Sequence, residues 1–317
     1  MSRAKIKAIS ITLFFDLAYE KWNRFLYFFR HKQSYRYNNF NCLRILFPKT
    51  YNWPPASKWF QTIISELKSI PGFSINDISQ QYSGLITIHV IKNNIKKEVT
   101  FDISDNPNVN NFDSIDNSLL YFKMQYHKNG YNNNNKVVHG QFIPGGIELY
   151  WYLSSLRKLN LKNKKFDVYG RFSPDFAHEI RGKAINLLQT QTKFVYTGEL
   201  KTIRYSRYLR EVAQSKICID LPGNGPFCFR LIEYLAIGSC IIGPPHETVF
   251  DPPLEDGVHI KYCKSDLSDL VELCEYYLEN DSERLQLVAN SRLFFDTYLR
   301  KDKLVQYYLN HILKEIS

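Results

Sequence analysis

The residues best suited to chemistry lie in one stretch, from Ile217 to Gly243. It reads ICIDLPGNGPFCFRLIEYLAIGSCIIG, which is an apolar run, a glycine-rich turn, an amphipathic run and a second apolar run. In the turn, Gly223, Asn224 and Gly225 allow the backbone to approach a ligand closely. A helix that follows such a turn offers free N–H groups and the positive end of its dipole, which favour a phosphate.

Arg230 and Glu233 lie three residues apart on the helix expected after this turn, so they share one face. An arginine one turn from the loop can reach a diphosphate, and a carboxylate one turn further can accept both hydroxyls of a ribose. The alternative for the two residues is an ordinary surface ion pair. Their position behind a glycine-rich turn at a strand end favours the ligand-binding interpretation.

A second turn of this type follows the strand expected at Phe166 to Tyr169. Gly170 and Arg171 come directly after that strand, and Ser173 with Pro174 predicts an N-cap and a first helical residue. Arg171 and Arg230, on neighbouring strand-end loops, would form a diphosphate clamp. The alternative for Arg171 is a role in capping the helix.

Regular alternation of strands and helices must position these loops. Such βα units imply a parallel sheet covered on both faces, with ligands at the carboxyl ends of the strands. The expected strands are 166–169, 194–196, 217–221, 240–242 and 258–262, and the expected helices are 174–188, 205–214, 227–237, 267–278, 282–298 and 303–313.

The first half of the chain is less regular. It predicts strands at 43–47, 119–125 and 137–143, a helix at 56–70, and a hairpin of 85–90 with 98–103. Regular secondary structure is then expected to break at Pro144, Gly145 and Gly146. We therefore expect a basic aromatic segment (1–36), a small α/β domain (37–145) and a Rossmann-like domain (146–317).

The composition limits the class of protein. The 317 residues are 44% apolar and 23% charged, which excludes disordered, collagen-like and disulfide-scaffold proteins. The six cysteines form no CxxC pair, and no apolar run reaches the length of a membrane-spanning helix. These features predict a reduced, cytoplasmic protein without a metal site.

The net charge of +10 is concentrated at the N-terminus. Residues 1–36 hold eight Lys and Arg against Asp16 and Glu20, interleaved with Phe, Tyr and Trp, a mixture that suits peripheral contact with an anionic membrane. The preferred alternative is a helix packed on the first domain with its charge solvated. Nucleic acid is disfavoured because the basic residues do not continue into a recognisable binding module.

The part from Phe166 to Tyr298 resembles the nucleotide-sugar-binding domain of GT-B glycosyltransferases. The resemblance rests on an ordered series of motifs. These are the strand into Gly170, the Pro-Gly loop, Arg230 and Glu233, Gly238, Gly243-Pro-Pro and Glu255-Asp-Gly257. Within that clan, the combination of Asn224-Gly-Pro, Phe229-Arg, Glu233 and Ala236-Ile-Gly is most similar to exostosin-type and CAP10-type transferases. The resemblance implies an α/β, GT-B-like fold of two Rossmann-like domains facing a cleft, with a small and atypical N-terminal domain.

By position, the resemblance assigns the donor ribose to Glu233, the diphosphate to Arg230 and Arg171, and the nucleobase to Tyr196 to Gly198. It implies a nucleotide-diphosphate sugar as donor, a glycan or lipid-linked acceptor, and no cofactor. In the retaining paired-glutamate enzymes a second glutamate stands eight positions before the ribose ligand; Gly225 stands there in this sequence, which favours an inverting reaction. The expected donor-binding residues are Gly170, Arg171, Tyr196, Gly198, Gly223, Asn224, Gly225, Arg230, Glu233 and Lys123.

An inverting transfer needs a base that removes the proton of the acceptor hydroxyl. Asp105 and Asp102, just beyond the strand near Phe101, are the candidates by position, with His127 and His139 behind them. Both aspartates are also ordinary turn formers, and Lys123, the cation expected at the donor, is also an ordinary strand lysine. Because no base is obvious, a non-catalytic nucleotide-binding or scaffolding module of the same fold is the alternative.

Overall fold

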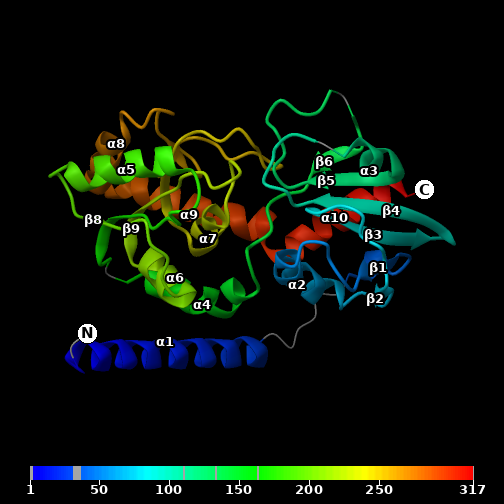
Figure 1. The fold of residues 1–317 in the computed structure, drawn as a ribbon, viewed down its shortest axis with the longest axis horizontal. Coiled ribbons are helices and arrows are strands. Elements are labelled where there is room, and N and C mark those ends of the chain that lie inside the picture. Colours follow the sequence, from blue (N-terminus) through cyan, green and yellow to red (C-terminus); the bar gives the residue numbers. More distant parts are fainter. Residues whose placement is uncertain (1–2, 31–36, 110, 133, 163, 317) are drawn as a thin grey trace.

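The structure is a computed structural model that describes residues 3–30, 37–109, 111–132, 134–162 and 164–316. Two β-sheets lie side by side, one in each half of the elongated molecule (Figure 1). The predicted fold class, two Rossmann-like α/β domains, is confirmed. The ends of the basic N-terminal segment, residues 1–2 and 31–36, lie outside the described residues.

The first sheet has six strands in the order β2-β1-β3-β4-β5-β6. Its β3–β4 pair is the predicted hairpin, while β1–β2, β4–β5 and β5–β6 are parallel, so the sheet is mixed. The strand bounds are β1 (Arg44–Pro48), β2 (Phe73–Asn76), β3 (Leu85–Lys92), β4 (Ile95–Asp102), β5 (Ser118–Lys123) and β6 (Val137–His139).

The second sheet is entirely parallel, in the order β11-β10-β9-β7-β8. Its chain order reverses between β7 and β9, and the crevice outside the carboxyl ends of such a pair is where doubly wound folds bind ligands. The strand bounds are β7 (Phe166–Tyr169), β8 (Tyr196–Thr197), β9 (Ser215–Ile219), β10 (Cys240–Gly243) and β11 (Lys261–Tyr262).

Helices cover both faces of each sheet. In the second sheet, Ile217 and Ile219 face the core under α5 and α8, while Cys218 between them faces the core under α6 and α7. This alternation places apolar side chains on both faces, as a buried parallel sheet requires. The helix bounds are α1 (Arg3–Arg30), α2 (Pro55–Leu67), α3 (Phe112–Asn117), α4 (Glu148–Asn160), α5 (His178–Thr190), α6 (Tyr205–Ala213), α7 (Phe229–Ile237), α8 (Leu270–Glu279), α9 (Asp281–Phe294) and α10 (Lys301–Glu315); single turns are η1 (Asn38–Phe40) and η2 (Phe295–Leu299).

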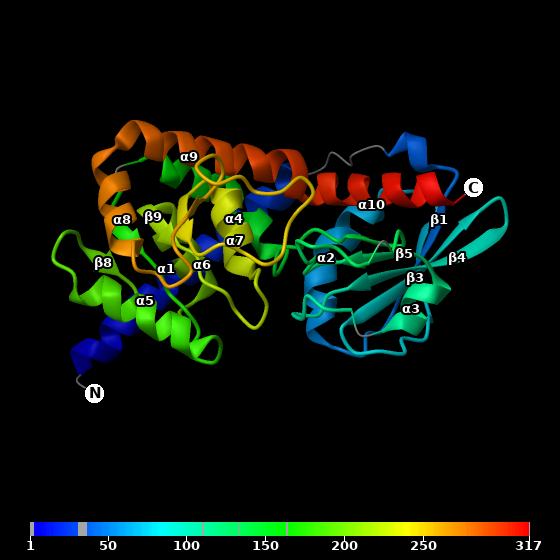
Figure 2. The ribbon, with the colours of Figure 1, turned by 90° about the horizontal axis from the view of Figure 1, so that it is seen from above.

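Helix α10 does not belong to the second domain, although the expected boundary assigned residues 146–317 to that domain. It leaves the second domain and packs on α2 and the first sheet (Figure 2). The Tyr308 ring meets the rings of Phe101 and Phe122 edge-on, each with a centroid distance of 5.0 Å. The first domain is therefore completed by the last helix.

Helix α1 also differs from expectation. It packs on α4 and α6 of the second domain rather than on the first domain. Most of the aromatic side chains that were expected to pack are exposed, with Phe14 at 68% and Phe29 at 69%, whereas Tyr27 is buried. The preferred interpretation, a helix that buries its aromatic residues on the first domain, is therefore wrong.

Candidate active site

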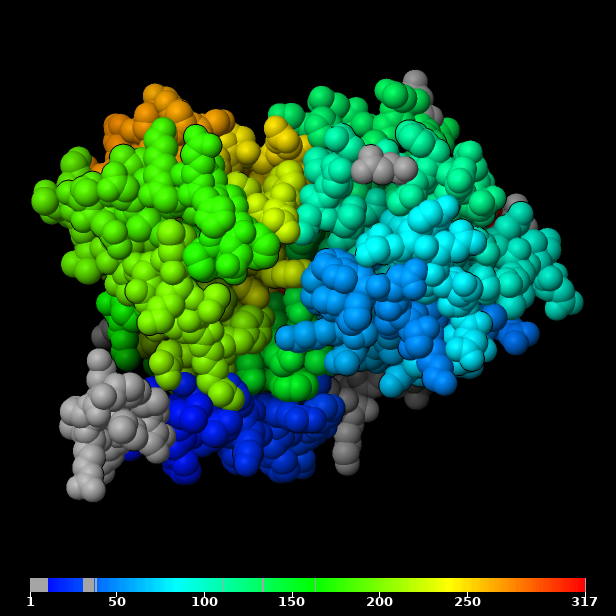
Figure 3. Space-filling model, in the orientation of Figure 1, coloured from blue at the N-terminus to red at the C-terminus, as the bar shows by residue number. Residues whose placement is uncertain are grey.

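A cleft of about 460 Å³ lies between the domains, at the carboxyl ends of β7 and β9. Figure 3 shows the hollow where the blue surface of the first domain meets the yellow-green surface of the second. The first domain contributes Trp53, Trp59, Asp105 and Phe142 to its wall. Six charged residues line it, Asp105, Arg171, Arg181, Lys201, Arg230 and Glu233, so cations outnumber carboxylates.

The glycine-rich loop forms the part of the wall between β9 and α7. Gly223 and Asn224 line the cleft, in the place expected for backbone approach to a ligand. Gly225 instead meets the first domain: a Cβ there would lie 2.4 Å from Nε2 of Gln125 and 2.6 Å from the carbonyl oxygen of Asp105. Only glycine permits this approach, so Gly225 serves the domain contact rather than a ligand.

Arg230 occupies the first turn of α7 and points along the cleft wall. Its Nη2 donates to the carbonyl of Leu221 at 2.8 Å, and its guanidinium lies 4.5 Å from the centre of the Phe172 ring. Its buried Nε has no hydrogen-bond partner among the described residues, and the nearest carboxylate oxygen, on Asp220, is 3.7 Å away. Its Nη1 lies 3.5 Å from the carbonyl oxygen of Arg171. Arg230 therefore lines the cleft as a cation that no carboxylate of the described residues holds at hydrogen-bond distance.

Glu233 follows one turn later and is 95% buried, since its exposed fraction is 5%. Burial raises the pKa of Glu233 to about 7, although Tyr205 and the charge of Arg230 partly offset this effect. The carboxyl group therefore changes charge near neutral pH. In its ionised form it can accept two hydroxyl donors at once.

Arg171 extends from the end of β7 into the cleft, but two carboxylates already hold it. Its Nε donates to Glu211 at 2.9 Å and its Nη1 to Glu199 at 2.7 Å. Of the other residues expected on this loop, Tyr196 donates its hydroxyl to the Gly170 carbonyl at 2.6 Å, and Gly198 packs on the same carbonyl. Those three residues shape the loop behind the cleft wall rather than lining it.

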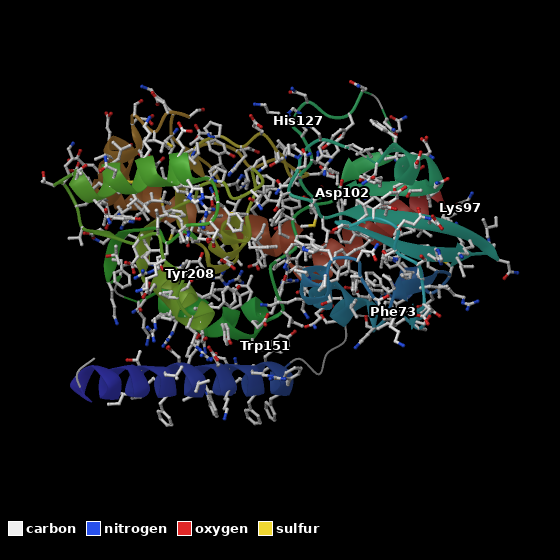
Figure 4. The ribbon with its side chains drawn as sticks, in the orientation of Figure 1. Phe73, Lys97, Asp102, His127, Trp151 and Tyr208 are labelled. Atoms are coloured by element: carbon white, nitrogen blue, oxygen red, sulfur yellow. The ribbon has the colours of Figure 1, made fainter. Side chains whose placement is uncertain are left out.

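The two candidate aspartates have different surroundings. Asp105 lines the cleft opposite the glycine-rich loop, and burial raises the pKa of its carboxyl group, although Asn224 and Lys123 lower it in part. Asp102 is the buried last residue of β4 (Figure 4), where Lys123 and Tyr121 each donate to it at 2.7 Å. The geometry makes Asp102 a structural carboxylate and leaves Asp105 at the cleft.

Lys123 does not reach the donor side of the cleft. Its side chain is fully buried, and its Nζ donates to Asp102 at 2.7 Å and to Ser104 at 3.0 Å. His127 and His139 lie on the same side of the first domain, where the ring of His139 stacks on Tyr126 at 3.7 Å. Lys123, His127 and His139 are not among the residues that line the cleft.

Sequence reasoning missed Arg181 and Lys201. Arg181 was expected inside a helix beginning at Pro174, but α5 begins at His178, so the Ser173 cap is not formed and Arg181 lies in the first turn. Its Nε donates to the Pro222 carbonyl at 3.0 Å, which ties α5 to the glycine-rich loop. Lys201 follows β8, and this position after the end of a strand was the sequence feature that could have predicted a place in the cleft.

Asp220 and His246 were also missed. Asp220 is buried at the end of β9, and its carboxylate lies 3.1 Å from Nε2 of His246. Nδ1 of His246 lies 3.2 Å from the hydroxyl of Tyr262. This chain of polar groups stands directly behind Arg230 and fixes the loop from which α7 begins.

Residues 150–310 match the model of a family described as glycosyl transferase-like. The match covers half of the chain and includes the loops after β7 and β9 together with α7. The chain belongs to this family. The matched residues include Arg171, Arg230 and Glu233, which line the cleft between the two domains.

The glycosyl transferase-like protein is also similar to a large viral protein, the uncharacterized protein 179R of Invertebrate iridescent virus 6. The two are 29% identical over 113 residues, which cover 33% of this chain. The aligned part spans 9% of the viral protein's length. Among the described residues of this chain, no helix has the length and apolar character to cross a bilayer.

Proposed function

We propose that the protein transfers a sugar from a nucleoside diphosphate sugar to a hydroxyl group of a glycan or lipid-linked acceptor. The observation that carries this proposal is the pair formed by Arg230 and Glu233 on one face of α7, both lining the cleft at the β7–β9 switch point. The spacing suits a diphosphate and the ribose next to it. The motifs that resemble exostosin-type and CAP10-type transferases include the same pair.

The proposed reaction is an inverting, metal-independent displacement. The acceptor hydroxyl oxygen attacks the anomeric carbon, its proton passes to the Asp105 carboxylate, and the bond from that carbon to the diphosphate oxygen breaks. Arg230, with Arg171, Arg181 and Lys201 around it, supplies positive charge to the departing diphosphate. Asp105 lines the same cleft from the first domain, with Asn224 of the glycine-rich loop beside its carboxyl group.

The aromatic side chains of the cleft support the same proposal. Trp59 stacks edge-on against Phe229 at 4.8 Å and joins the wall of the first domain to the start of α7. Such rings provide apolar surface for a base or a sugar face.

We place the protein in a reducing compartment such as the cytoplasm because its six cysteines are free thiols.

Thermal unfolding in the presence of UDP, GDP, ADP and CDP tests the proposal. A bound ligand stabilises the folded state by RT ln(1 + [L]/Kd), so one of the four should raise Tm at millimolar concentration. The same titration with EDTA present tests independence from metal. If none of the four shifts Tm, the proposal is wrong; a shift with no sugar transfer would instead favour the non-catalytic nucleotide-binding module.

A further inference from the structure

Helix α1 is amphipathic in the reverse of the usual sense, because its polar face turns toward the protein. Asp16 pairs with Arg207 at 2.6 Å and also with Arg210, both on α6. Glu20 accepts two hydrogen bonds of 2.6 Å from Arg204, which is the residue that precedes α6. These pairs fix the rotation of α1 about its axis.

The outer face of α1 consists of Phe14, Phe15, Lys21, Trp22, Phe25 and Phe29. Its five aromatic side chains are each between 59% and 69% exposed, and side chains project from this side of the helix away from the molecule (Figure 4). A row of exposed aromatic residues on this scale marks an interaction surface. Because the only carboxylates of α1, Asp16 and Glu20, face inward, the outer face is apolar and cationic.

A crevice of about 300 Å³ lies beside this face, between α1 and α4. Trp22 lines it together with Arg30, Lys158 and Ser154. Arg30 donates to the Ser154 hydroxyl at 3.4 Å. The residues that line the crevice include two cations and no carboxylate, so its chemistry suits a phosphate group adjoining an apolar surface.

We propose that the outer face of α1 docks the protein on the surface of an anionic lipid bilayer. Aromatic rings favour the depth of the lipid head groups, and basic residues favour anionic lipids. A second copy of the chain is the weaker candidate, because it would bring Lys21 of one copy against a face without carboxylates in the other. The helix would lie in the plane of the membrane.

Sedimentation of the full chain with vesicles tests this proposal without any donor or acceptor, so its outcome is separate from that of the transferase proposal. The vesicles are phosphatidylcholine alone or mixed with phosphatidylserine. We expect binding to the mixed vesicles, reversed by salt as the Debye length falls below about 8 Å. The variant Phe14→Ser/Trp22→Ser/Phe25→Ser should lose binding by about tenfold or more for each ring removed.

Phe112→Ser is the matched control, because Phe112 is 67% exposed on α3 of the other domain. It should bind vesicles like the parent. Lys21→Glu/Lys158→Glu should weaken binding only to the vesicles that contain phosphatidylserine. Unfolding curves of all variants should coincide with that of the parent, since the changed side chains are exposed.

Three results would overturn the proposal. The first is that the parent stays in solution with both kinds of vesicle. The second is that the triple variant binds as tightly as Phe112→Ser. The third is a parent dimer, seen by analytical ultracentrifugation, that becomes a monomer in the triple variant without any vesicle binding, since a second copy would then occupy the face.

Discussion

The side-chain amide of Gln125 pairs with both the N–H and the carbonyl of Phe227, at 3.1 and 2.9 Å. Gln125 belongs to the first domain and Phe227 to the glycine-rich loop of the second, so one side chain holds the two walls of the cleft together. Gln141 forms the same double contact with Asp251, further from the cleft. The two amides give the domain junction a fixed geometry.

Gln125→Leu should weaken both the fold and the binding of a nucleoside diphosphate. The substitution leaves the buried N–H and carbonyl of Phe227 without partners, which costs about 1–3 kcal/mol for such a group. Urea unfolding measures the loss and calorimetry measures affinity. Gln141→Leu is the control, with a similar loss of stability and unchanged affinity; equal affinity losses in both variants would show that Gln125 has no special effect on the cleft.

Arg230→Ala should weaken binding of the nucleoside diphosphate by about 1.5–3 kcal/mol, the range for hydrogen bonds to charged groups. Arg230→Lys should recover only part of the loss, because an ammonium group cannot reproduce the planar donors of a guanidinium. Titration calorimetry measures both. Arg292→Ala, on an arginine side chain that is 44% exposed and outside the cleft, is the control; the prediction fails if all three variants bind alike.

Glu233→Gln should change how stability depends on pH. The pKa of Glu233 in the folded protein, about 7, lies above its ordinary value of 4.5, so the folded protein holds the proton more tightly. The contribution of this group to the free energy of unfolding is greatest below pH 4.5 and is lost as pH rises to 7. The free energy of unfolding of Glu233→Gln, measured relative to that of the parent, should therefore rise by up to ~3 kcal/mol between pH 4 and pH 8.

Unfolding in urea at several pH values measures this difference. The same pair of proteins tests the ribose contact, because two hydroxyl donors require the ionised carboxylate. The affinity of the parent for the nucleoside diphosphate should rise through pH 7 more steeply than the affinity of Glu233→Gln. The comparison with the variant removes the effect of the ligand's own phosphate ionisation, because that effect is the same for both proteins. Parallel pH profiles would mean that Glu233 does not contact the ligand.

Asp105→Asn should reduce the rate of sugar transfer by about 10²- to 10⁴-fold, the contribution of a positioned base, with little change in donor affinity. Asp102→Asn should instead unfold the protein more readily, by about 3–5 kcal/mol, because it breaks the buried pair with Lys123. Single-turnover rates and urea curves separate the two effects. A normal rate in Asp105→Asn would exclude it as the base.

The centre of the second sheet could be predicted from the sequence because β9 and β10 contain short apolar runs between helical patterns. The expected strand at Phe166–Tyr169 has the observed bounds. The end of α7 was equally clear, since Gly238 takes the left-handed conformation (φ 85°) that closes a helix. In contrast, β2 was missed because it is an edge strand of only four residues, too short for its alternation of apolar and polar residues to stand out.

The contacts between domains could not be predicted. Gln125 and Phe227 are separated by 102 residues, and a glutamine in a strand-end segment carries no local sign of its partner. The rotation of α1 could not be predicted for a similar reason. The sequence of α1 shows its charges and aromatic residues, but the arginines of α6 determine which face turns inward. Arg181 was missed because the loop before α5 is four residues longer than Ser173-Pro174 suggested.

The return of α10 makes the first domain discontinuous. Residues that build its sheet are synthesised early, but the helix that covers Phe101 and Phe122 emerges only after the entire second domain. Locally connected βα units can fold as they appear, whereas this long-range closure must wait. During translation the half-built first domain therefore exposes an apolar sheet, and the second domain matures before the one that precedes it.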